Sequence, residues 1–104
     1  MTGLDDRLAE MAARGETAGY GTLARDLGLR MTDLTAALEA MMERDAAAGR
    51  PFRAALLDAR LTPGQPARGF FDKAAALGRP LTPVDIPAER AALFAAAGRD
   101  RSAP

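Results

Sequence analysis

The chain has 104 residues, a length typical of a single domain, and 48% of them are apolar. It contains no cysteine and no histidine, which excludes disulfides, thiolate or imidazole metal ligands, cysteine nucleophiles and acid–base catalysis by histidine. Fourteen basic and fourteen acidic residues cancel, so the overall charge does not indicate a polyanionic partner. This composition argues against most enzyme classes, and we expect no catalytic residues, no cofactor and no metal ion.

The sequence also lacks the patterns that direct a chain to a membrane. No apolar run approaches the roughly 20 residues that a helix needs to span a bilayer. The N-terminal segment from Met1 to Asp6 is acidic and does not have the basic-then-apolar order of a secretory signal. We therefore expect a cytoplasmic protein with no membrane partner.

Three helices are predicted in the first half of the chain. Apolar residues at i, i+4 and i+7 form one stripe in each of the two longer helices. A glycine follows each helix, as is typical of a helix C-terminus. The predicted ranges are Leu4–Arg14, about Gly21–Leu27, and Met31 or Thr32 to Ala48, followed by Gly15, Gly28 and Gly49.

The second half combines one apolar segment with two further helices. Phe52–Arg60 has the length and apolar continuity of a buried strand, and Pro63-Gly64 in the loop after it suits a tight turn. Helices are predicted over Ala67–Leu77 and, opened by Pro87 and capped by Gly98, over Ala88–Ala97. We expect a disordered tail over residues 99–104.

A single strand must find a partner for its backbone hydrogen bonds. The candidates are the extended piece Glu16–Gly19, the connector Leu81–Ile86, and the same strand of a second chain. The sequence does not choose among them.

The stretch from Tyr20 to Leu38 matches the residue preferences of a helix-turn-helix. With Tyr20 as the first position, Ala24 is the small residue where the two helices cross, and Gly28 is the turn residue that needs a positive φ. The apolar positions are filled by Leu23, Leu27, Leu29, Leu34 and Ala37.

A three-helix core followed by a strand and a turn is typical of a winged helix. We expect a single domain over residues 1–98, mainly α (α+β), with about five helices and one short strand or hairpin. The helix-turn-helix would cover about 20–47, the wing strand and turn about 51–66, and the C-terminal helices 67–97.

Charge is unevenly distributed along the chain. Residues 1–47 have a net charge of −4 and residues 48–79 a net charge of +4. In a wing, arginines can contact phosphates or a minor groove; alternatively, these arginines pair with the acidic half within one molecule or across a dimer. The candidate DNA contacts in the basic part are Arg50, Arg53, Arg60 and Arg68.

The predicted recognition helix supplies fewer basic groups. Arg30, Thr32 and Thr35 lie at its exposed N-terminal positions and are candidate DNA contacts. Asp33 and Glu39 share this surface and would repel phosphates. A helix-turn-helix used only for packing or for binding a protein is therefore the alternative.

A family resemblance enters through two segments. Tyr20-Gly21-Thr22-Leu23-Ala24, and later Arg50-Pro51-Phe52-Arg53, resemble the winged-helix domain of alkylguanine alkyltransferases and alkyltransferase-like proteins. That family has Pro-Cys-His-Arg where this chain has Pro51-Phe52-Arg53, so the resemblance implies DNA binding without alkyl transfer to sulfur. The pattern of Pro63-Gly64, Gly69-Phe70-Phe71 and Leu77-Gly78 resembles small bacterial proteins and implies no activity.

Two functions therefore stay open. The first is a small, non-catalytic, winged-helix DNA-binding protein with a regulatory or accessory role. The second is a protein-interaction module with the same fold. We also expect a homodimer, formed through the strand 52–60 or through Leu93 and Phe94 of the last helix, because two-fold pairing doubles the contacts with DNA.

Overall fold

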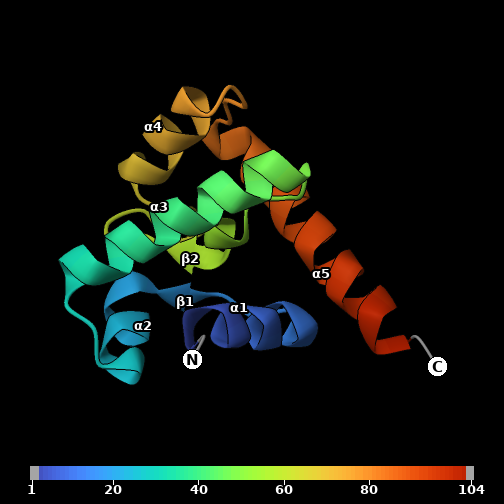
Figure 1. Ribbon diagram of the computed structural model, residues 1–104, viewed down its shortest axis with the longest axis horizontal. Helices are drawn as coiled ribbons and strands as arrows, with labels where there is room; N and C mark the ends of the chain where they lie inside the picture. Colours follow the sequence, from blue (N-terminus) through green and yellow to red (C-terminus); the bar gives the residue numbers. More distant parts are fainter. Residues whose placement is uncertain (1–2, 103–104) are drawn as a thin grey trace.

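Five α-helices form most of the computed structural model, which describes residues 3–102 and, for residues 99–102, the backbone alone. In Figure 1, α3 crosses the middle of the molecule, with α4 on one side and α1 and α2 on the other. The expectation of a mainly helical fold is confirmed. The helices are α1 (Gly3–Arg14), α2 (Tyr20–Leu27), α3 (Met31–Ala48), α4 (Arg68–Ala76) and α5 (Ile86–Ser102).

The first three helices lie where the apolar spacing predicts them. Leu8 and Met11 of α1 are buried, as are Leu34 and Leu38 of α3. Gly28 ends α2 with a φ of +67°. Only glycine adopts such a conformation without strain, so this residue sets the short turn into α3.

The centre of the fold is the short segment that follows α3. It consists of a 3₁₀ helix, η1 (Arg53–Leu56), and the strand β2 (Leu57–Asp58). Phe52, Leu56 and Leu57 are fully buried there, and α1, α3 and α5 all pack against η1. The apolar continuity of this segment therefore reflects burial on all sides.

The prediction of a strand over Phe52–Arg60 is wrong for most of that range. The Phe52 N–H donates to the Glu89 carboxylate at 2.7 Å, and the Arg53 N–H donates to the Asp45 carboxylate at 3.0 Å. Side chains of α5 and α3 thus satisfy backbone groups that a strand would pair in a ladder. The segment can then coil into η1, which its alanines favour over an extended conformation.

Leu57 and Asp58 are extended, and they pair with the extended piece that is predicted near the N-terminus. Strand β1 (Ala18–Gly19) lies parallel to β2, with Ala18 opposite Leu57 and Gly19 opposite Asp58. Of the three candidate partners for the strand, Glu16–Gly19 is therefore the one used. Over residues 3–102 this parallel pair is the whole sheet, so the wing strand expected within residues 51–66 is reduced to Leu57–Asp58.

The last helix is longer than predicted at both ends. A second 3₁₀ helix, η2 (Pro83–Asp85), leads into it, and the Thr82 N–H donates to the Asp85 carboxylate at 2.8 Å. The backbone stays helical through Gly98 to Ser102, so Gly98 is not a C-cap and residues 99–102 are not an irregular tail. The rest of the expected tail, residues 103 and 104, lies outside the described residues.

None of the helices in the described part of the chain is long and apolar enough to cross a membrane.

Candidate functional site

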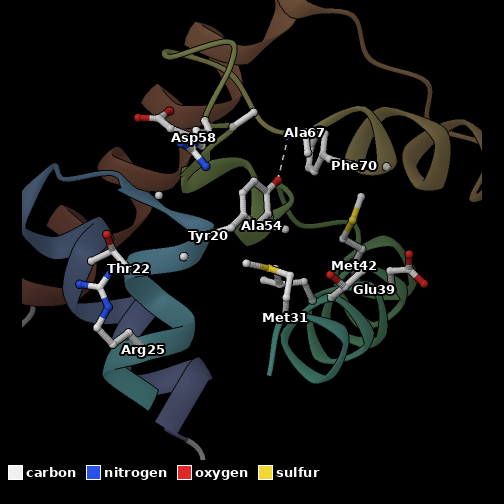
Figure 2. A pocket seen from close by; sticks show the side chains of 17 residues that line it. Tyr20, Thr22, Arg25, Met31, Glu39, Met42, Ala54, Asp58, Ala67 and Phe70 are labelled. Carbon is white, nitrogen blue, oxygen red and sulfur yellow. Dashed lines mark hydrogen bonds between the residues drawn. The ribbon is translucent and has the colours of Figure 1, made fainter. Parts of the chain in front are cut away.

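A groove of about 730 Å³ lies between α2, α3, the segment after β2, and the start of α4. Figure 2 shows the side chains that surround it, among them Tyr20, Met31, Met42 and Phe70. Its lining is mostly apolar. The lining residues are Gly19, Tyr20, Gly21, Thr22, Arg25, Met31, Thr35, Leu38, Glu39, Met42, Ala54, Asp58, Ala59, Arg60, Ala67, Gly69 and Phe70.

Helix α3 contributes one complete side of the groove. Met31, Thr35, Leu38 and Met42 recur at helical spacing and line it together. Leu38 and Met42 are buried, whereas Met31 is 47% exposed. The floor is therefore an extension of the core, and the apolar surface continues outward to the open edge at Met31.

Tyr20, the first residue of α2, contributes the opposite side. Its hydroxyl oxygen accepts a 3.0 Å hydrogen bond from the backbone N–H of Ala67, directly before α4 (Figure 2). Burial raises the pKa of the Tyr20 phenol, although the hydrogen bond from Ala67 acts in the opposite direction. The phenol therefore keeps its proton at neutral pH. No described residue accepts a hydrogen bond from the Tyr20 hydroxyl, so this group can donate a hydrogen bond to a ligand.

Contacts between helices hold the walls of the groove in place. The Lys73 ammonium of α4 donates to the Glu43 carboxylate of α3 at 2.7 Å, and this hydrogen bond raises the pKa of Lys73. The ring of Phe70 packs edge-on against Phe52, with 5.9 Å between the ring centroids. The groove is thus formed in the free protein.

The basic residues predicted to contact DNA have different environments. Arg50 and Arg53 form ion pairs with the fully buried Asp45, at 3.2 and 2.9 Å. Arg68 is exposed, and its guanidinium lies 3.9 Å from Asp72 on the same helix. For Arg50 and Arg53, the alternative of pairing with the acidic half of the chain is the arrangement found.

Of the remaining predicted contacts, two line the groove and two do not. Thr35 and Arg60 line the groove. Arg30 and Thr32 lie outside it, exposed at the N-terminal end of α3. Of the seven predicted contacts, the structure therefore brings only Thr35 and Arg60 together in the groove.

Sequence reasoning missed the groove itself. Arg25 lines it but was not a predicted contact, and Met31 was considered only as a possible helix start. One signal was available: Met31 lies seven residues before Leu38, on the same side of α3, so the apolar stripe of this helix extends beyond its buried part. An apolar residue that extends the stripe to the surface indicates a surface to be covered.

In the described part of the chain, no three histidine, cysteine, aspartate or glutamate side chains gather in a way that could hold a metal ion.

Comparison of the chain with protein-family models, with curated proteins and with solved structures finds no match. Function is therefore inferred from the chain's own side chains and their contacts.

Proposed function

We propose that this protein is a non-catalytic protein-interaction module that binds a segment of a partner protein in the groove between α2, α3 and α4. One observation carries the proposal: the groove has an apolar floor that stays open to the outside at Met31. Binding sites of roughly 300–1,000 Å³ with an apolar lining and a few polar groups are typical of ligand recognition in proteins.

The groove also offers the polar groups that orient a peptide. The Tyr20 hydroxyl can donate a hydrogen bond, and Thr22 and Thr35 are among the lining residues. A backbone carbonyl of a bound segment is a suitable acceptor for these donors. Because the walls are held by the contacts of Tyr20 and Lys73, little ordering of the protein opposes binding.

DNA binding is the second candidate, favoured by the turn between α2 and α3. Gly28 has the left-handed conformation that a helix-turn-helix requires, and Arg30 and Thr32 are exposed just after it. Two features weigh against this candidate. The carboxylate of Asp45 holds both Arg50 and Arg53, and Asp33 and Glu39 are exposed on the would-be recognition helix.

A selection from a random peptide library, displayed on phage, tests the proposal with the full chain as bait. We expect the selection to enrich peptides that contain apolar residues. These peptides should bind the Met31→Asp variant about tenfold more weakly than the wild type, because a carboxylate at position 31 would lose its hydration when a peptide covers the apolar groove. Val84→Asp is the matched control, since Val84 is 86% exposed on η2, outside the groove. The affinity of the Val84→Asp variant for the enriched peptides should equal that of the wild type.

Failure to enrich any peptide whose binding depends on Met31 would refute the proposal. In parallel, a DNA duplex is titrated at low and at high salt. Retarded migration that is lost as the salt concentration rises would favour the second candidate.

A further inference from the structure

The pairing of positive charges over the molecule singles out two arginines. The structure describes the side chains of twelve of the fourteen basic residues, all except Arg99 and Arg101. Nine of the twelve lie within 4.0 Å of a carboxylate. The three described side chains without such a partner are Arg25, Arg30 and Arg60. Two of them, Arg25 and Arg60, line the groove.

These two arginines come from separate parts of the chain, α2 and the segment after β2, and both are exposed. A guanidinium beside an apolar surface favours an anion that it can bind through two parallel hydrogen bonds. Most other described cations already have a carboxylate from this chain. The ligand of the groove is therefore expected to bring its own anionic group to Arg25 and Arg60.

The lining of the groove also carries an acidic residue without an ion-pair partner in the described part of the chain, Glu39. Figure 2 shows Arg25 and Glu39 on either side of Met31. Glu39 has no ion-pair partner among the described residues, whereas Asp58, the other carboxylate of the lining, is bound by Arg90 at 2.7 Å. Arg25 and Glu39 therefore place opposite charges on the two sides of Met31 (Figure 2).

This arrangement of charges favours a protein segment over a nucleic acid as the occupant of the groove. A nucleic acid carries a negative charge at every nucleotide and would place phosphates near Glu39. A protein segment can place an acidic residue beside Arg25 and Arg60 and a neutral or basic residue beside Glu39. It can also supply apolar side chains for the floor.

We propose that the groove binds an acidic and apolar protein segment, with its carboxylates at Arg25 and Arg60, its apolar side chains on the floor formed by Met31, Leu38, Met42 and Phe70, and no acidic residue at Glu39. This inference rests on the proposed function and specifies the chemistry of the partner.

The test repeats the phage selection with three baits: the wild type, the double variant Arg25→Glu/Arg60→Glu, and Arg30→Glu. Arg30 is the matched control, because it is the third described arginine without a carboxylate partner but does not line the groove. Circular dichroism and thermal unfolding verify that each variant folds. Enriched sequences are synthesised with a fluorophore, and their affinities are measured by fluorescence anisotropy.

We expect the wild type and Arg30→Glu to enrich the same class of peptides, with aspartate or glutamate beside apolar residues. The double variant should bind these peptides at least tenfold more weakly and should enrich peptides with lysine or arginine at the same positions. Neutralising one arginine, as in Arg25→Gln or Arg60→Gln, should weaken binding about two- to fivefold, as expected for one exposed ion pair.

The outcomes separate this inference from the proposed function. If Met31-dependent peptides are enriched without an acidic preference, and the double variant selects the same sequences, the function stands and the inference is overturned. If no peptide is enriched whose binding depends on Met31, both the proposed function and this inference are refuted. If a DNA duplex displaces the bound peptides and its own affinity depends on Met31, Arg25 and Arg60, the occupant is a nucleic acid and both are again overturned.

Discussion

The hydroxyl group of Tyr20 and the backbone N–H of Ala67, 47 positions apart in the sequence, form a hydrogen bond of 3.0 Å. It joins the first turn of α2 to the start of α4, across the groove from Met31 and Met42 (Figure 2). The bond therefore holds together the side of the groove that faces α3. A substitution that removes this hydrogen bond therefore tests how the site is held together.

Tyr20→Phe should lower the free energy of unfolding by about 1 kcal/mol, because it leaves the partly buried Ala67 N–H without an acceptor while the ring still fills its place. Urea unfolding followed by circular dichroism measures the change. Leu61→Ala is the control, since Leu61 is 90% exposed and its truncation should have little effect. An equal loss of stability in both variants would contradict this role of the hydroxyl.

The stability of the protein should fall at alkaline pH through Tyr20. Burial raises the pKa of this phenol above its ordinary value of 10.0. The unfolded chain therefore loses the phenolic proton at a lower pH than the folded chain does. The stabilisation is complete below about pH 10 and is lost as the pH rises through the folded pKa.

Two measurements test this pH dependence. Tyr20 is the only tyrosine and the chain has no tryptophan, so tyrosinate absorbance reports on this residue alone and should appear at a higher pH in the folded than in the urea-unfolded chain. The alkaline loss of stability should also be smaller in Tyr20→Phe. Lys73, whose pKa is also raised, acts in the same direction but is present in both proteins. Coincident tyrosinate titrations of folded and unfolded protein would contradict the prediction.

We expect Asp45 to stabilise the fold through its contacts with Arg53. Its side chain is fully buried and accepts hydrogen bonds from both the backbone N–H and the guanidinium Nε of Arg53. Asp45→Ala should therefore destabilise the fold by about 3 kcal/mol, because it leaves a partly buried cation and a backbone N–H unpaired.

Asp72→Ala is the matched control for this prediction. Asp72 is 71% exposed and lies 3.9 Å from a guanidinium that is itself 94% exposed. Its removal should change the stability by less than about 0.5 kcal/mol. Similar midpoints of urea unfolding for the two variants would show that the Asp45 contacts contribute little.

Two glycine substitutions should have opposite effects. Gly28→Ala should destabilise the protein by about 1 kcal/mol, because the φ of +67° at this position disfavours any side chain. Gly98→Ala should stabilise it by about 0.5–1 kcal/mol, because Gly98 lies inside α5, lacks a positive φ and has open space where a Cβ would lie. Thermal unfolding measures both. A destabilising Gly98→Ala would mean that α5 ends at that glycine, as the sequence alone suggested.

The sequence by itself determined the local structure of the first half of the chain. The apolar stripes through Leu8 and Met11, and through Leu34 and Leu38, predicted helices with the correct buried faces. Gly28 predicted the turn between α2 and α3. These features depend on residues within a few positions of one another, so helical periodicity and backbone sterics suffice to predict them.

Only the tertiary structure decided the conformation of the segment after Pro51 and the existence of the groove. Phe52–Arg60 has the composition of a buried strand, but Glu89 and Asp45 bind its first backbone N–H groups, and neither neighbours them in sequence. The groove likewise brings together Arg25 and Arg60, which no sequence spacing links. Such contacts depend on how distant helices pack against each other, and that arrangement is not encoded in any local pattern of residues.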